Sequence, residues 1–167
     1  MHKQALDVTF RDTVHCSDPE AIFQLTESCG LFYPEETAVA RELAEERLAR
    51  GPSSGYEFLF AQKDGLVTGY TCFGPIPFTQ GRFDLYWIAV QKDLQGTGIG
   101  KRLLQLTEVR IQEMRGRRIY VETSSRKPYT PTHRFYLSSG YHQEVILTDF
   151  YAPGDDKIIY MKALLCR

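Results

Sequence analysis

Residues 88–102 read Ile88-Ala89-Val90-Gln91-Lys92-Asp93-Leu94-Gln95-Gly96-Thr97-Gly98-Ile99-Gly100-Lys101-Arg102. This pattern predicts an apolar strand that leads through a polar loop and three alternating glycines into a helix. The first four N–H groups of a helix have no acceptor within it, and glycine lets an anion approach them because it has no Cβ. The helix dipole adds about half a positive charge at the same end. The segment therefore predicts a loop that binds a phosphate-bearing ligand, and a diphosphate fits it.

The spacing of the glycines argues against the two commonest phosphate-binding motifs. A Walker A loop, G-x-x-x-x-G-K-[ST], would need glycine at Gln95 and a hydroxyl residue at Arg102. The dinucleotide motif G-x-G-x-x-G would need glycine at Lys101. Neither a nucleoside triphosphate nor a dinucleotide is expected here. A tight turn between strand and helix, with no ligand, remains the structural alternative.

Two strings in this chain carry a resemblance to a known family. Residues 95–100 match Q/R-x-x-G-x-G/A, and residues 133–141, His-Arg-Phe-Tyr-Leu-Ser-Ser-Gly-Tyr, are close to F-Y-x-x-x-G-[FY]. Their order and their separation of about 40 residues resemble the GNAT superfamily of N-acetyltransferases. The resemblance implies an acyl-CoA-dependent N-acyltransferase that uses acetyl-CoA as co-substrate, with no metal.

Composition limits the class of protein. The chain has 167 residues and is 43% hydrophobic, enough for one core, and a single domain over residues 1–167 is expected. Its 20 basic and 21 acidic residues favour neither nucleic acid nor membrane as a partner. Residues 1–8 lack the apolar run of a signal peptide, which predicts a cytoplasmic protein. The four cysteines, Cys16, Cys29, Cys72 and Cys166, and the four histidines, His2, His15, His133 and His142, show no metal-ligand spacing.

Hydrophobic periodicity predicts alternating strands and helices. Asp18 is expected to cap the first helix, and Asp64-Gly65 predicts a hairpin turn. Expected strands cover 5–14, 56–62, 66–73, 83–90, 117–123, 141–150 and 157–165; expected helices cover 18–29, 34–50, 98–115 and 131–139. The 83–90 run is nearly continuously apolar, as for a strand buried on both faces. The resemblance implies the α+β GNAT fold, a mostly antiparallel mixed sheet of six to seven strands, splayed between strands 4 and 5, with about four helices on both faces.

The resemblance also implies how the coenzyme is held. The backbone of Ile88, Ala89 and Val90 would bind the pantetheine arm, and residues 95–100 would bind the diphosphate. Lys101 and Arg102 would contact phosphate oxygens, or they are simply solvated helix residues.

Three residues are candidates for the proton transfers. Tyr136 corresponds to the family's usual general acid, although an aromatic core role explains it too. Asp84 is the first candidate base, because a carboxylate in an apolar strand is costly unless it is used; an edge charge is its alternative. Glu122, which interrupts the next apolar strand, is the second candidate. Either carboxylate would serve to bind the substrate's ammonium if the proton leaves through water.

Aromatic and acidic residues outline the acceptor site that the resemblance implies. Candidates for substrate binding are Phe32, Tyr33, Phe78, Tyr129 and Tyr151, joined by Phe150, Asp155 and Asp156. Together they predict a pocket for a cationic amine with an apolar part. The acidic residues of the second helix, such as Glu42 and Glu45, are read as its solvated face.

The expected function is acetyl transfer from acetyl-CoA to a primary amine, of a small molecule in the first place, by direct attack in a ternary complex. A protein lysine or N-terminal acetyltransferase is the alternative within the same reaction, and a non-catalytic acyl-CoA sensor is the alternative of another class. Residues 158–161, Ile-Ile-Tyr-Met, would permit a homodimer through the last strands, although an ordinary core strand explains them equally.

Overall fold

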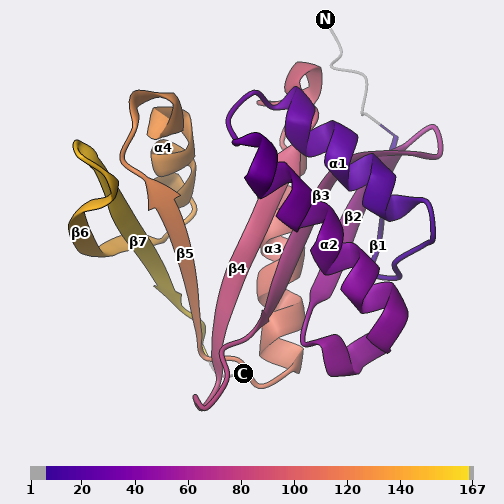
Figure 1. The fold of residues 1–167 in the computed structure, drawn as a ribbon. Helices are drawn as coiled ribbons and strands as arrows, with labels where there is room; N and C mark the ends of the chain where they lie inside the picture. The colour runs from indigo at the N-terminus through magenta and orange to yellow at the C-terminus, as the bar shows by residue number, and fades with distance from the viewer. Residues whose placement is uncertain (1–6, 166–167) are drawn as a thin grey trace, which may run out of the picture. The chain divides into compact units, whose positions relative to one another are not determined.

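The computed structural model describes residues 7–165, and in that range it contains seven strands and four α-helices (Figure 1). In chain order they are β1 Val8–Arg11, α1 Asp18–Ser28, α2 Pro34–Arg50, β2 Glu57–Lys63, β3 Leu66–Pro75, β4 Arg82–Val90, α3 Ile99–Glu113, β5 Arg118–Ser124, α4 Thr130–Ser138, β6 His142–Ala152 and β7 Asp155–Ala163. The predicted order of elements and the α+β class are confirmed. Residues 5 and 6 of the first predicted strand lie outside the described range.

The strands form one mixed sheet in the order β1-β2-β3-β4-β5-β7-β6. The β5–β7 and β6–β7 pairs are antiparallel, whereas β4 and β5 are parallel. The β4–β5 register covers only Arg82–Asp84 against Arg118–Tyr120, although both strands continue beyond these residues. The resemblance implied a sheet that separates between its fourth and fifth strands, and the pairing stops at that place.

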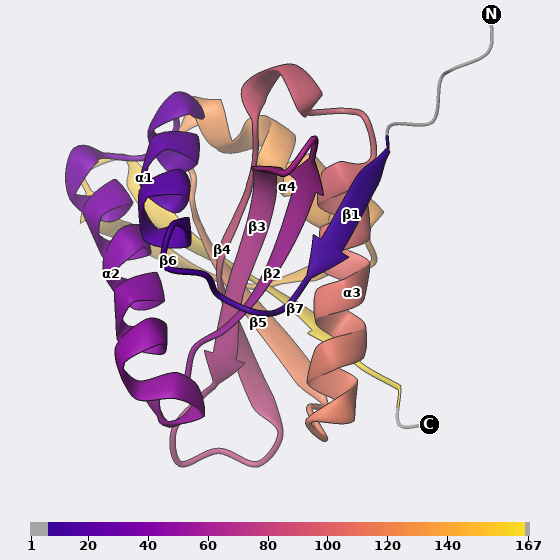
Figure 2. The ribbon, with the colours of Figure 1, turned by 90° about the vertical axis from the view of Figure 1, so that its right-hand side faces the viewer.

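The chain divides into two compact units. The first contains the described residues up to Cys72 together with Trp87–Thr107, and the second contains Phe73–Tyr86 together with Glu108 onward. In the first unit, α1 and α2 lie on one side of β2 and β3, and α3 lies on the other (Figures 1 and 2). Its core is built from fully buried side chains of both layers, including Ile22, Ala44, Phe58, Phe60 and Tyr70.

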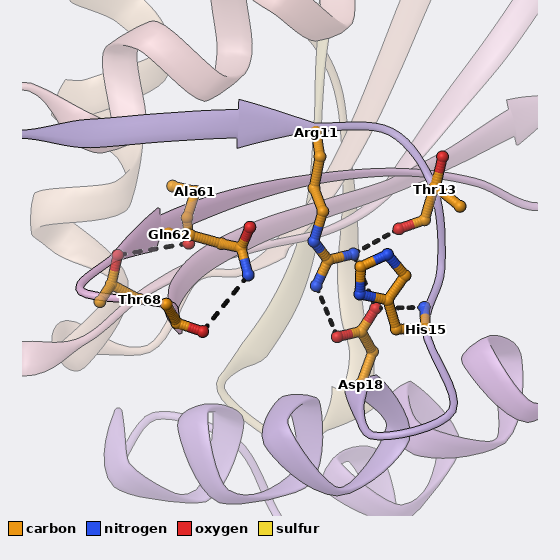
Figure 3. Close-up of polar contacts among 8 residues, drawn as sticks. Arg11, Thr13, His15, Asp18, Ala61, Gln62 and Thr68 are labelled. Atoms are coloured by element: carbon orange, nitrogen blue, oxygen red, sulfur yellow. Dashed lines mark hydrogen bonds and ion pairs between the residues drawn. The ribbon is translucent and has the colours of Figure 1, made fainter.

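Asp18 is not the cap that the sequence predicted. Ser17 occupies the N-cap position, and Asp18 is the first helical residue, with 1% of its surface exposed. Its carboxylate accepts hydrogen bonds from the Arg11 guanidinium at 2.6 and 2.8 Å and from the His15 amide at 2.7 Å (Figure 3). Burial of this carboxylate requires such partners, so Asp18 ties β1 to α1 instead of capping a helix.

The predicted ends of α2 and of the first hairpin are confirmed. The Glu36 carboxylate accepts the Tyr33 amide at 2.7 Å where α2 begins, and Gly51 ends the helix. Asp64 and Gly65 both have positive φ angles, 52° and 79°, as a two-residue hairpin turn requires. These local signals are strong because each depends on a conformation that few residue types adopt.

The expectation that β4 is buried on both faces is wrong for its middle. Tyr86 is 37% exposed, and Asp84, Trp87 and Ile88 are only half-buried. The pairing with β5 ends at Asp84, so the residues beyond it lack that neighbouring strand. The apolar run of residues 83–90 therefore marks a strand with a partly uncovered second half.

In the second unit, β7 lies between β5 and β6. Phe135 and Tyr136 of α4 form an aromatic cluster with Tyr141 and with Tyr160 of β7. Ile158, Tyr160 and Met161 are buried, which confirms the core-strand explanation of residues 158–161. β6 is the edge strand, and all of its residues are exposed. The turn before β5 needs glycine at position 116, because a Cβ there would lie 2.2 Å from Ile111 Cγ2 and 2.9 Å from Phe83 Cδ2.

Candidate active site

The glycine loop joins β4 to α3 in the first unit and presents backbone amides at the start of the helix. Arg102 N–H donates to the Gly98 carbonyl at 3.0 Å, so the amides of residues 99–101 precede the first acceptor that the helix provides. Gly96 and Gly98 have φ angles of 77° and 99°, which side chains rarely allow. Residues 95–98 are exposed. The arrangement provides several N–H donors and the positive end of a helix dipole at an open surface.

The loop is held in place by its own chain. The Gln91 amide donates to the Thr68 carbonyl at 2.9 Å, and Thr97 Oγ1 donates to the Leu94 carbonyl at 2.6 Å. The Gln95 side chain, which the resemblance assigned to the diphosphate, donates from Nε2 to the Val90 carbonyl at 3.1 Å. Gln95 thus holds the loop against the end of β4.

The same carbonyl has a second donor that the sequence did not indicate. Cys29 Sγ, at the end of α1, lies 3.7 Å from the Val90 oxygen and donates to it. Burial raises the pKa of the Cys29 thiol, so the group stays protonated and keeps its donor. A thiol 61 residues away in the chain offers no local pattern from which this contact could have been predicted.

Glycine at position 69 lets β3, β4 and α3 approach one another. A Cβ on Gly69 would lie 3.1 Å from the Ala89 carbonyl oxygen and 3.1 Å from Leu103 Cδ1. Ala89 and Val90 are buried and Ile88 is half-buried, whereas Lys101 and Arg102 are exposed. Close packing here sets where α3 begins, and with it where the loop amides point.

In the second unit, Asp84 and Glu122 lie on the same face of the β4–β5 pair. Asp84 is opposite Tyr120, and Glu122 follows two residues along β5, so side-chain alternation points all three the same way. Burial, and then the charge of Glu122, raise the pKa of Asp84 from 3.8 to about 6, while Lys157 opposes this shift. Glu122 itself forms an ion pair with Lys157, with Oε2 and Nζ 2.7 Å apart. The raised pKa makes Asp84 a stronger base than an ordinary aspartate.

Tyr136 lies inside the aromatic cluster of the second unit. It is 2% exposed, and its ring centroid lies 5.4 Å from that of Phe135, 5.5 Å from Tyr141 and 5.8 Å from Tyr160. Burial raises the pKa of its hydroxyl, which therefore stays protonated throughout the physiological range. The Tyr136 ring is therefore part of the core, as one of the two sequence interpretations expected. Its hydroxyl keeps its proton and can donate it.

Comparison with known proteins identifies the family. The model of the acetyltransferase (GNAT) family matches residues 20–141. The chain belongs to the GNAT acetyltransferase family.

Solved structures and a curated relative agree with this assignment. A protein of Desulfovibrio desulfuricans, described as an acetyltransferase of the GNAT family, is 43% identical, with a TM-score of 0.93 over 95% of this chain and 99% of that one. An uncharacterised N-acetyltransferase of Methanocaldococcus jannaschii is 30% identical over 63% of this chain, and the match spans 65% of the archaeal protein. An aminoglycoside 6′-N-acetyltransferase complexed with coenzyme A shares the fold, at 17% identity and a TM-score of 0.77 over 96% of this chain and 98% of that one.

The predicted acceptor residues of this GNAT chain do not form one cluster within either unit. In the first unit, Phe32 packs edge-on against Trp87 with centroids 4.9 Å apart, and Tyr33 is 53% exposed at the start of α2. In the second, Phe78 is fully exposed in the β3–β4 turn, and Tyr129 is buried with the Arg126 guanidinium 5.4 Å from its ring centroid.

Tyr151 lies on β6 beside Phe150, and both rings face Lys157. The two aspartates of the β6–β7 hairpin are engaged within the chain. Asp155 is 8% exposed and accepts a hydrogen bond from Ser124 Oγ, and Asp156 accepts the Asp149 amide at 2.8 Å. Each of these two hydrogen bonds uses the Oδ1 atom of the aspartate.

The sequence interpretation also missed Lys157. A lysine near the start of a strand reads as a solvent-facing charge, whereas this side chain is 13% exposed.

The structure contains no cluster of three or more His, Cys, Asp or Glu side chains suited to a metal among residues 7–165. Over the same range, no helix is both long and apolar enough to cross a membrane.

Proposed function

We propose that the protein transfers an acetyl group from acetyl-CoA to a primary amine of a small molecule, by direct attack of the amine on the thioester in a ternary complex. The observation that supports this most strongly is the glycine loop, with its exposed amides at the start of α3. Membership of the GNAT family supplies the reaction class.

The amides of Gly96 and of residues 98–101 would bind the diphosphate of the coenzyme, whereas the Thr97 amide donates to the Leu94 carbonyl at 3.4 Å. Backbone donors and the helix dipole both favour an anion there, and the exposed Lys101 and Arg102 add full positive charges. The backbone of Ile88, Ala89 and Val90 would lie along the pantetheine arm. Because these contacts use backbone groups, their side chains need only be apolar.

Asp84 would receive the proton that the attacking amine loses. An alkylammonium has an ordinary pKa near 10, and a carboxylate with a pKa of about 6 accepts a proton more readily than an ordinary aspartate does. Below that pH Asp84 is protonated and neither binds nor deprotonates an ammonium. Glu122, paired with Lys157, would hold charge beside Asp84 instead of acting as the base.

Tyr136 would protonate the departing thiolate. The nitrogen attacks the carbonyl carbon, the C–S bond breaks, and the sulfur takes the phenolic proton, so that the net proton passes from the amine to the thiol of coenzyme A. The raised pKa of the phenol makes it a weaker acid than free tyrosine. Its contribution would therefore come from a positioned hydrogen bond that becomes a proton transfer only as charge develops on sulfur.

Two measurements test the proposed function. Titration calorimetry with coenzyme A should detect binding in the micromolar range typical of enzyme substrates, and thiol release from acetyl-CoA should rise with at least one amine in a panel of small amines and peptides. Absence of heat at millimolar coenzyme would remove the whole proposal. Turnover with peptides alone would indicate a protein acetyltransferase, and binding without turnover would indicate an acyl-CoA sensor.

A further inference from the structure

The Lys157 ammonium lies in a cation-binding arrangement made by its own chain. Its Nζ is 2.7 Å from Glu122 Oε2, 3.8 Å from the centroid of the Phe150 ring and 5.5 Å from that of Tyr151. The lysine side chain is only 13% exposed. A carboxylate and two aromatic faces around one ammonium are the groups that a protein uses to bind a cationic ligand. Lys157 therefore occupies a site that would otherwise accept a positive charge.

This site adjoins the candidate base. Lys157 is opposite Ser124 on β5, and side-chain alternation places Ser124, Glu122 and Tyr120 on one face, the face that Asp84 shares. The charges of Glu122 and Lys157 both act on Asp84. Among residues 7–165, Asp84 forms no ion pair, whereas Glu122 is neutralised by Lys157. One carboxylate thus remains for an incoming ammonium.

The two rings are held in place by the β6–β7 turn. Asp149 N–H donates to Asp156 Oδ1 at 2.8 Å, and Gly154 N–H donates to Asp149 Oδ1 at 2.7 Å. The Asp156 amide in turn donates to Ser125 Oγ at 2.8 Å, which connects the turn to the end of β5. These bonds fix the strand from which Phe150 and Tyr151 project, so the arrangement around Lys157 is pre-organised.

We propose that Lys157 determines acceptor specificity by filling the cation site formed by Glu122, Phe150 and Tyr151, so that the enzyme acetylates amines with a single positive charge and rejects diamines and polyamines. The inference rests on the proposed function and names its substrate class. A monoamine brings only its reacting ammonium, which Asp84 balances. A second ammonium would meet a site already occupied by a like charge.

The first experiment tests whether Lys157 occupies a cation site, and it needs no catalysis. Lys157→Ala removes the ammonium and its alkyl stem, and n-butylammonium replaces both. NMR titration should show n-butylammonium binding beside the Phe150 and Tyr151 rings in Lys157→Ala and not in the wild type, in which an ammonium is expected only at the separate Asp84 carboxylate. Binding should weaken about tenfold or more in Lys157→Ala/Glu122→Gln, which removes the carboxylate, and n-butanol, the neutral analogue, should bind more weakly than n-butylammonium. Equal binding to the wild type and Lys157→Ala, or equal binding of n-butanol and n-butylammonium, overturns the site.

The second experiment measures selectivity. The ratio of kcat/KM for n-hexylamine to that for 1,6-diaminohexane should exceed about tenfold in the wild type and in Lys157→Arg, and should fall about tenfold in Lys157→Met, which keeps the apolar stem without the charge. Circular dichroism confirms that each variant is folded.

The failures of the two proposals are distinguishable. A wild-type protein that binds coenzyme A but acetylates no amine overturns the proposed function, and the specificity claim falls with it. A wild type that prefers the diamine, or a Lys157→Met variant whose ratio equals that of the wild type, overturns the role of Lys157 alone.

Discussion

At the scale of single residues, Asp84 differs from its neighbours in the strand, and this difference is the basis of its proposed role. It is a carboxylate in the otherwise apolar start of β4, half-buried and close enough to Glu122 for their charges to interact. The sequence could predict that a carboxylate at this position needs a compensating interaction or a chemical role, because burying an unpaired carboxylate is unfavourable. It could not predict that Glu122 already has a lysine partner, whereas Asp84 forms no ion pair among residues 7–165.

The rate of acetyl transfer should depend on the ionisation of Asp84. Since the base must be deprotonated, kcat/KM is expected to fall tenfold per pH unit as the pH drops below about 6, the raised pKa of Asp84. Thiol-release rates between pH 5 and 9 give this profile. Asp84→Asn should lose the acidic limb together with most of the activity, whereas Glu122→Gln should keep the limb and shift it to lower pH, because it removes a negative charge. A limb unchanged in both variants would indicate a water relay.

Asp84 should also reduce stability, with a definite pH dependence. Its raised pKa means that the folded state holds the proton more tightly than the unfolded chain, so the ionised carboxylate is unfavourable in the fold. This cost is absent below pH 3.8 and complete above about pH 6. Asp84→Asn is therefore expected to raise the free energy of unfolding by about 1 kcal/mol at pH 7, allowing for solvent screening of a half-buried group. Denaturant melts at pH 7 and at pH 4 test this, and a gain of equal size at both pH values would contradict it.

Replacing Tyr136 by phenylalanine should slow acetyl transfer without disturbing the packing of the ring. Its ring is held by three aromatic neighbours, which phenylalanine at this position would keep. Tyr136→Phe is expected to lower kcat by about 100-fold while the KM for acetyl-CoA and the melting temperature stay near the wild-type values. Because the phenol stays protonated, the loss should be uniform from pH 6 to 9. Wild-type turnover of every accepted amine by this variant would exclude Tyr136 as the acid.

At the scale of elements, the glycine loop and the start of α3 form one structure. Periodicity and the glycine spacing were sufficient to predict the strand, the loop and the helix, because each follows from local conformational preference. The hydrogen bond from the Gln95 side chain to the Val90 carbonyl could not be predicted from local conformational preference. It depends on the position of the Val90 carbonyl, to which Cys29 also donates, and that position is set by tertiary packing. The exposure of Tyr86 likewise follows from strand pairing that ends early, which no pattern within β4 reveals.

The loop conformation should be needed for coenzyme binding, and the chain offers a matched control for this prediction. Gly98 and Gly30 both have positive φ, and a Cβ on either would meet no atom within 4 Å. Gly98→Ala and Gly30→Ala should each lose about 1 kcal/mol of stability through backbone strain. Only Gly98→Ala should weaken coenzyme A binding, by about tenfold or more, because only Gly98 lies in the loop whose amides are proposed to bind the diphosphate. Calorimetry compares the two variants, and equal affinities would argue against this loop as the binding site.

At the scale of the whole molecule, the sequence predicted the order of the strands and α-helices in residues 7–165, and the two family-like strings predicted the reaction class. The predicted acceptor residues do not gather in one cluster within either unit. Asp155 and Asp156 serve the hairpin, Tyr129 is buried under Arg126, and Phe78 is fully exposed. Coenzyme binding depends on backbone conformation, which short motifs encode, whereas acceptor binding depends on side chains from distant segments whose partners only the fold reveals.

The location of Lys157 has an evolutionary consequence. The glycine loop belongs to the first unit, whereas the lysine, its carboxylate partner and the two rings all belong to the second. With the role proposed for Lys157, replacing this one side chain would alter which amines are acetylated while the unit with the glycine loop keeps its sequence. Gene duplication followed by drift at this position would give a lineage of such enzymes a short mutational path to new acceptors.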